Sequence, residues 1–194
     1  MATIAVFHSV LGVKPGLLEA ADMLRSHRHT VHVIDQYNGR VFDDYDPAME
    51  HMEGIGFGAL MASALAAGGE LPPGFVTLGF SNGAGMAQYV AAKVPAVAGA
   101  VMSGGAIDPG YLEITWPQGI PAQIHTTVDD PWREQDAIEA AAAAVAAAGG
   151  AIEVFDYPGA GHLFADASKP DEYQPEEAEL MWSRVLDFLS RIDG

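Results

Sequence analysis

A serine with a glycine two residues away on either side lies between an apolar run and a helical pattern. Residues 74–92 read GFVTLGFSNGAGMAQYVAA, and residues 79–83, GFSNG, form a G-x-S-x-G motif. In such a sharp strand-to-helix turn the serine adopts a strained backbone conformation, and the glycines remove the Cβ atoms that would clash. The motif therefore predicts that Ser81 is a nucleophile. The alternative is that Ser81 or Asn82 only caps the helix.

A serine hydroxyl is a weak nucleophile unless a base removes its proton and a carboxylate orients that base. Downstream, PAQIHTTVDDPWRE offers Asp129 and Asp130 after an apolar run, and IEVFDYPGAGHLFAD places His162 in a glycine-rich loop. Both groups follow predicted strands, so the same sheet edge should bring them beside Ser81. Either aspartate could orient the histidine. Asp130 precedes Pro131, which is typical of a helix start, and it could serve as the helix cap as well.

Acyl transfer also needs hydrogen-bond donors for the oxyanion that forms on the substrate carbonyl. The backbone N–H of Asn82, the residue after the serine, is the first candidate. The second is expected from the loop after the first strand, FHSVLGV, where Ser9 or Val10 would donate through the backbone.

Other groups that could do chemistry are less persuasive. The stretch HRHTVH holds three histidines, His27, His29 and His32. It straddles a helix end and a strand with no cysteine or carboxylate to complete a ligand set, so we expect no metal. We expect a structural role for His8, and surface positions for Asp156 and Asp166. The glycine spacing fits neither a dinucleotide loop nor a P-loop, which predicts no cofactor, and the absence of cysteine excludes thiol chemistry.

Alternating strands and helices must position these groups. Apolar runs predict strands over residues 4–7, 31–34, 75–78, 97–102, 122–125 and 152–155. Helical patterns cover residues 16–26, 47–67, 83–93, 131–148 and 175–191. This alternation is typical of an α/β protein with a parallel sheet and helices on both faces. Residues 36–46 and 103–119 are expected to form loops that wall the substrate site.

Composition limits the possible partners. The 194 residues predict one domain, 1–194, and carry a net charge of −17, which disfavours nucleic acid and anionic membranes as partners. The apolar runs are shorter than a membrane span, and the start MATIAVFHSVLG lacks a basic region before its apolar residues. We therefore expect a cytoplasmic protein, as a monomer or homodimer.

Five segments fall in an order that resembles the dienelactone hydrolase family of α/β-hydrolases: VFHSVLGV, VIDQYNG, GFSNGAGMA, PAQIHTTVDD and YPGAGHLF. The resemblance covers nearly the whole chain. It implies a compact α/β-hydrolase fold, with a mostly parallel sheet of six or seven strands, helices on both faces and no large lid domain. It also maps the nucleophile onto Ser81, the catalytic histidine onto His162 and the second oxyanion donor onto Val10. The family's acid lies five residues after a strand-end histidine, here His125, which selects Asp130 over Asp129.

Three positions depart from the family's founding members. Those enzymes use a cysteine where this chain has Ser81, a glutamate where it has Ser9, and a carboxylate-binding arginine where it has Asp166. These departures disfavour dienelactone as the substrate. A serine with a carboxylate-oriented histidine instead predicts an esterase that acts on small esters or lactones through an acyl-enzyme on Ser81, and the acidic residues expected around the pocket favour a neutral or cationic substrate. The alternatives are the same triad acting on a peptide, thioester or carbon–carbon bond, or a catalytically silent binding protein.

Overall fold

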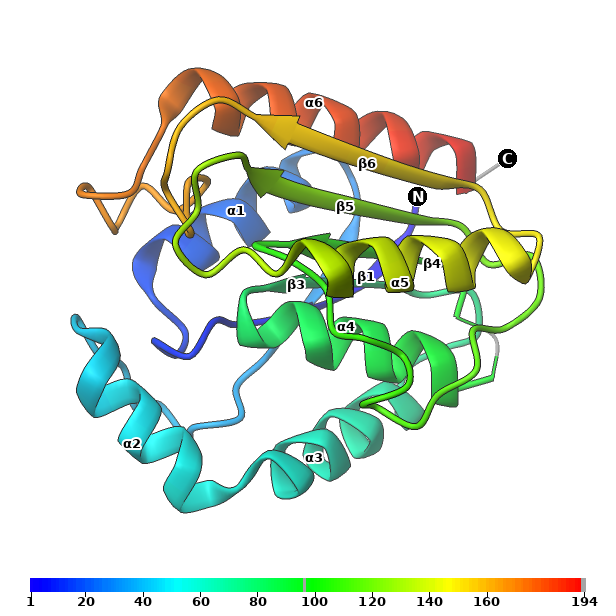
Figure 1. Ribbon diagram of the computed structural model, residues 1–194, viewed down its shortest axis with the longest axis horizontal. Coiled ribbons are helices and arrows are strands. Elements are labelled where there is room, and N and C mark those ends of the chain that lie inside the picture. The colour runs from blue at the N-terminus through cyan, green and yellow to red at the C-terminus, as the bar shows by residue number, and fades with distance from the viewer. Residues whose placement is uncertain (96, 193–194) are drawn as a thin grey trace.

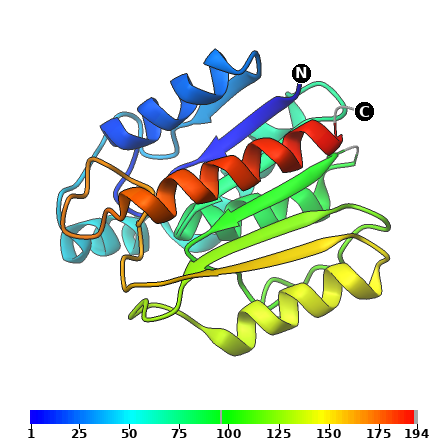
Figure 2. The same ribbon diagram turned by 90° about the horizontal axis from the view of Figure 1, so that it is seen from above.

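The computed structural model describes residues 1–95 and 97–192; residues 96, 193 and 194, which the expected domain includes, lie outside the described residues. In the described part, six strands form one parallel sheet in the order β2-β1-β3-β4-β5-β6 (Figures 1 and 2). The strands are β1 (Thr3–Phe7), β2 (Thr30–Ile34), β3 (Val76–Phe80), β4 (Gly99–Ser103), β5 (Ala122–Thr127) and β6 (Ile152–Tyr157). The helices are α1 (Pro15–Ser26), α2 (Tyr45–Ile55), α3 (Phe57–Gly69), α4 (Asn82–Lys93), α5 (Gln135–Ala147) and α6 (Pro175–Ile192). The expected α/β architecture without a large lid is confirmed.

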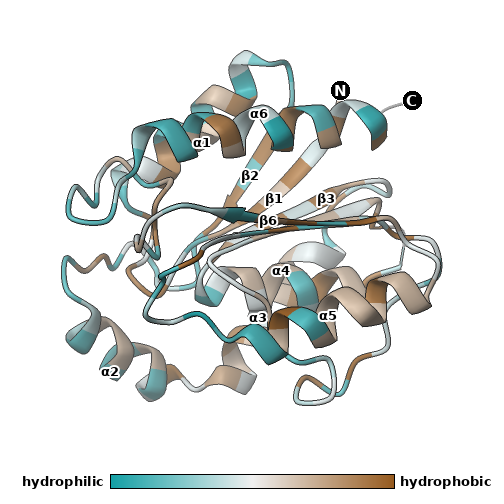
Figure 3. Cartoon of the chain, turned by 45° about the horizontal axis from the view of Figure 1, so that its top comes forward, coloured by the Kyte–Doolittle hydropathy of each residue, from teal (hydrophilic) through white to brown (hydrophobic). Residues whose placement is uncertain are grey.

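The sheet separates two hydrophobic cores because successive strand residues point to opposite faces. On β1, Ile4 and Val6 face the core under α1 and α6, whereas Ala5 and Phe7 face the core under α3, α4 and α5. Figure 3 shows these two helical layers above and below the sheet. The central strands β3, β4 and β5 are buried along their whole length; β3 and β4 are mainly apolar, as expected for a doubly covered sheet, whereas β5 also buries Gln123, His125, Thr126 and Thr127.

Two predicted helices differ from the observed ones. The helix expected over residues 47–67 is two helices, α2 and α3, which meet at Gly56. Its φ of 87° lies in the left-handed region, so it interrupts a right-handed helix. The helix expected from residue 131 begins at Gln135. Asp130 is therefore not its N-cap; its Oδ1 accepts a hydrogen bond from the Trp132 N–H at 2.8 Å and shapes a turn.

The loops expected over residues 36–46 and 103–119 largely lack helix or strand, although α2 already begins at Tyr45. Within the described residues, none of the helices has the length and apolar character needed to cross a bilayer.

Candidate active site

The G-x-S-x-G segment forms the tight turn between β3 and α4. Ser81 has φ 54° and ψ −120°, a conformation that L-residues rarely adopt. A Cβ on Gly79 would collide with the Gly83 carbonyl, and one on Gly83 would collide with the Phe7 carbonyl oxygen. The two glycines are thus required by close backbone contacts. The turn is fixed by the Ser81 N–H, which donates to the Ser103 carbonyl at 2.7 Å.

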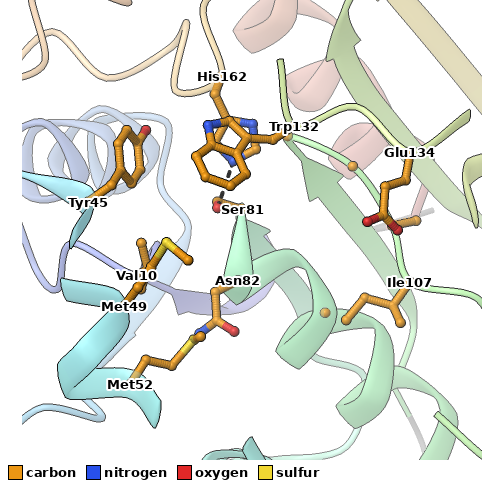
Figure 4. A pocket seen from close by; sticks show the side chains of 14 residues that line it. Val10, Tyr45, Met49, Met52, Ser81, Asn82, Ile107, Trp132, Glu134 and His162 are labelled. Atoms are coloured by element: carbon orange, nitrogen blue, oxygen red, sulfur yellow. Dashed lines mark hydrogen bonds between the residues drawn. The ribbon is translucent and has the colours of Figure 1, made fainter. Parts of the chain in front are cut away.

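Three of the predicted site residues meet in one hydrogen-bonded chain. His162 Nε2 lies 2.7 Å from Ser81 Oγ, and His162 Nδ1 lies 2.7 Å from Asp130 Oδ2 (Figure 4). The His162 and Asp130 side chains are only 7% and 1% exposed. A carboxylate facing Nδ1 holds the proton on that nitrogen and leaves Nε2 free to accept the serine proton. The Ser81 hydroxyl therefore points at the imidazole rather than at the first turn of the helix.

The two adjacent aspartates have different surroundings. Asp130 is buried against His162, whereas Asp129 is exposed and its backbone N–H donates to the Gly159 carbonyl at 3.0 Å. The geometry places Asp130 at the imidazole, in agreement with the spacing from His125.

Both predicted oxyanion donors border the same cavity as the serine. Val10 and Asn82 line a pocket of about 270 Å³ that also contains Ser81 and His162. Val10 lies in a tight turn after β1, where the Gly12 N–H donates to the Ser9 carbonyl at 3.1 Å. The pocket thus opens where an acyl group would meet both the hydroxyl and these two backbone segments.

The two segments expected to wall the site, residues 36–46 and 103–119, contribute Tyr45 and Ile107 to the pocket lining. The other walls were not found from the sequence; they come from α2 and from the loop after β5, and include Met49, Met52, Trp132 and Glu134. Figure 4 shows the methionines and Tyr45 on one side of Ser81, with Ile107 and Glu134 on the other. Tyr45, Met49 and Met52 are spaced along one helix face, a signal that in the sequence also fits a core-facing stripe.

The charge of the pocket is set by Glu134, since no lysine or arginine of the described residues lines it. Arg133 is turned away: its guanidinium pairs with Asp156 at 2.9 Å and donates to Thr126 Oγ1 at 2.6 Å. Asp166 is half-buried and accepts a hydrogen bond from the Ser168 N–H, also away from the pocket.

The other histidines have structural surroundings. His8 is buried; its Nδ1 donates to the Ser9 carbonyl at 2.6 Å, its Nε2 accepts from the Gln36 N–H, and burial lowers its pKa. Burial also lowers the pKa of His125 to about 3, and this ring bonds to the Tyr157 hydroxyl at 2.8 Å. His27, His29 and His32 belong to no metal-ligand group within the described residues.

The sequence model of the dienelactone hydrolase family matches residues 2–193. The chain belongs to this family. Membership of this family gives the chain a hydrolase function. Among curated proteins, none matches the sequence.

Solved structures share the fold at low sequence identity. A putative dienelactone hydrolase from Klebsiella pneumoniae superposes with a TM-score of 0.77 and 18% identity, covering 98% of this chain and 87% of that one. A dienelactone hydrolase-like promiscuous phosphotriesterase from metagenomic libraries gives 0.76 and 16%, with coverage of 99% and 87%. A thermophilic esterase from Thermogutta terrifontis gives 0.65 and 14%, with coverage of 96% and 83%. At these identities the likeness shows a shared fold.

Proposed function

We propose that this protein is a serine hydrolase that cleaves small carboxylic esters or lactones through an acyl-enzyme on Ser81. The observation that carries the proposal is the chain of two 2.7 Å hydrogen bonds from Ser81 Oγ through His162 to Asp130, at the wall of an accessible pocket. A serine hydroxyl needs this arrangement to become nucleophilic. A protein that only binds a ligand would have no need of all three groups.

In the first half of the reaction, His162 Nε2 takes the Ser81 proton while Oγ attacks the substrate carbonyl carbon. The carbonyl oxygen becomes an oxyanion, which the backbone N–H groups of Asn82 and Val10 stabilise. Each such donor contributes about 3–4 kcal/mol to the transition state. His162 then returns its proton to the departing alkoxide, so an alcohol leaves and an acyl-serine ester remains. A lactone reacts in the same way, with its alcohol still tethered to the acyl group.

In the second half, water attacks the acyl-serine carbonyl and His162 accepts a proton from it. The same histidine protonates Ser81 Oγ as the ester bond breaks, which releases the carboxylic acid and restores the enzyme. Throughout both halves the Asp130 carboxylate, 2.7 Å from Nδ1, stabilises the imidazolium that forms.

Pocket size and polarity point to a small, uncharged substrate. The volume of about 270 Å³ lies just below the range of about 300–1,000 Å³ common for ligand sites. Its walls are mainly methionine, isoleucine and aromatic side chains, with an exposed Glu134 at the border. A short acyl or alkyl chain fits such walls, whereas a carboxylate would find no lysine or arginine among the described lining residues.

Labelling with a fluorophosphonate probe tests the proposal. Wild-type protein should be labelled and should hydrolyse p-nitrophenyl acetate. Ser81→Ala should lose the label and about 10⁴-fold or more in turnover. Ser63→Ala, which changes an exposed serine on α3, is the matched control and should behave as wild type. Labelling that persists in Ser81→Ala, or an unlabelled wild type, would contradict the proposal.

A further inference from the structure

The loop that carries His162 is held by a carboxylate from later in the same connection between β6 and α6. Glu172 Oε2 accepts a hydrogen bond of 2.7 Å from the backbone N–H of Leu163, the residue that follows His162. The Glu172 side chain is 15% exposed, so this bond is largely shielded from water. A short hydrogen bond from a largely buried side chain restricts the backbone next to the imidazole.

The same carboxylate also reaches the wall of the pocket. The Tyr45 hydroxyl, at the start of α2, donates to Glu172 at 2.8 Å (Oε1) and 3.1 Å (Oε2). Burial and the neighbouring Glu172 carboxylate raise the pKa of Tyr45, so its hydroxyl stays protonated and remains a donor. The Tyr45 ring lies 6.5 Å from the His162 ring and 5.8 Å from the Trp132 ring. One side chain thus connects the histidine loop with the helix that lines the pocket.

Helix α2 is attached to the rest of the fold mainly by half-buried side chains. Ala48 is its only fully buried residue, and Gly56 separates it from α3. Met49 and Met52 on this helix form one pocket wall. The bond between Tyr45 and Glu172 therefore fixes the end of α2 that lies nearest to His162.

We propose that Glu172 is a positioning residue. It holds the His162 imidazole and the α2 wall of the pocket at the relative positions that acyl transfer requires. This inference rests on the function proposed above. Glu172 touches neither the substrate nor the reacting atoms; it acts through the Leu163 backbone and the Tyr45 hydroxyl.

The reach of Glu172, rather than its charge, is what this role requires. Lys169 lies 3.9 Å from Glu172 and 2.7 Å from Asp171, so a cation already lies beside both carboxylates.

A second side chain holds the same loop without any charge: the Gly161 N–H donates to Gln174 Oε1 at 3.0 Å, and Gln174 Nε2 donates to the Pro158 carbonyl at 2.7 Å.

Two substitutions separate reach from charge. Glu172→Gln keeps the length: its amide oxygen can accept from the Leu163 N–H, and its NH₂ can donate to the Tyr45 hydroxyl oxygen. Glu172→Asp keeps the charge but is one methylene shorter, so it cannot reach both partners. Asp171→Asn is the matched control, because Asp171 pairs with the same lysine and is 65% exposed on its side chain.

The assay measures kcat and KM for p-nitrophenyl acetate together with the rate of fluorophosphonate labelling. We expect Glu172→Asp to lose about tenfold in kcat and in labelling rate, equivalent to about 1.4 kcal/mol, with KM nearly unchanged. Glu172→Gln and Asp171→Asn should stay within about threefold of wild type. Thermal unfolding shows which variants are folded.

If Glu172→Asp does not fold, Glu172→Gln and Tyr45→Phe carry the test. Tyr45→Phe keeps the ring but removes the bond to Glu172, and should raise KM about threefold for an ester whose chain reaches Met49 and Met52. An unchanged KM in Tyr45→Phe overturns the proposal. So does a larger loss of kcat in Glu172→Gln than in Glu172→Asp, or a loss of kcat in Asp171→Asn equal to that in Glu172→Asp. A wild type that hydrolyses esters but is not labelled by the probe would refute Ser81 as the nucleophile. The inference on Glu172 would still be tested in that case by comparing kcat among Glu172→Asp, Glu172→Gln and Asp171→Asn.

Discussion

Replacing Asp130 with asparagine gives the sharpest test of the proposed catalytic geometry. Asp130 Oδ1 accepts from the Trp132 N–H at 2.8 Å, and Oδ2 faces His162 Nδ1 at 2.7 Å. In Asp130→Asn the Trp132 N–H should keep the amide oxygen on its side, which turns the NH₂ group toward the imidazole. Nδ1 must then accept a hydrogen bond, so the ring proton moves to Nε2, where it blocks proton transfer from Ser81.

The size of the effect follows from two contributions. With both side chains almost fully buried, an imidazolium and a carboxylate about 4 Å apart attract by about 4 kcal/mol at an effective dielectric of about 20, which is nearly 10³-fold in rate. The wrong tautomer adds to this loss. We therefore expect kcat to fall by about 10³–10⁴-fold, in line with the general effect of this substitution in Ser-His-Asp triads.

Asp129→Asn is the control, because this neighbouring side chain is exposed and should change kcat less than about twofold. Both variants would be compared with wild type for p-nitrophenyl acetate turnover and fluorophosphonate labelling, after circular dichroism has shown that they are folded. Equal losses in the two variants, or a larger loss in Asp129→Asn, would refute the reasoning.

Three further predictions follow from particular residues. Because Glu134 borders the pocket, a neutral ester should exceed a matched carboxylate-bearing ester about three- to tenfold in kcat/KM at low salt and less at high salt; a preference for the anion would contradict this. Because the folded protein holds the pKa of His125 at about 3 against an ordinary value of about 6.5, the unfolded chain binds more protons between these values. Stability should therefore fall by about 2 kcal/mol from pH 6.5 to pH 5, measured by urea unfolding, and His125→Asn should flatten this slope; an unchanged slope would contradict it. Gly83→Ala should cost more than about 3 kcal/mol, because its Cβ meets the Phe7 carbonyl, whereas Gly54→Ala meets nothing and should be neutral or stabilising; equal unfolding midpoints would contradict it.

The sequence was sufficient to predict the sheet and the meeting of three side chains. Each predicted strand overlaps an observed one, and a parallel sheet brings the carboxyl ends of its strands to one edge. Ser81, Asp130 and His162 each follow a strand closely, so the order of the runs determined where these residues would lie. Their catalytic roles and the backbone donors at Asn82 and Val10 stay predictions.

Other features depend on contacts that the sequence does not encode locally. The break at Gly56 was missed because glycine also occurs inside α2, at Gly54, and nothing in the pattern separates the two. The methionines of α2 have the spacing of a core-facing stripe, and only the fold shows that they face a pocket. Glu172 lies in a non-periodic segment, and its two partners are 9 and 127 positions away in the chain.

The order of the strands explains why glycine matters beside the proposed triad. Ser81 follows β3 and His162 follows β6, and two strands, β4 and β5, lie between them. With neighbouring strands about 4.8 Å apart, the histidine must reach back across roughly 14 Å of sheet edge to meet the serine. The chain leaving β4 therefore has to pass beneath the imidazole without a side chain. Gly104 has φ 85°, and a Cβ there would lie 3.2 Å from His162 Cε1 and 3.3 Å from the Ser81 backbone nitrogen. The hydrogen bond between His162 and Ser81 thus depends on a residue that contributes no functional group, because a Cβ on Gly104 would crowd both the imidazole and the Ser81 backbone.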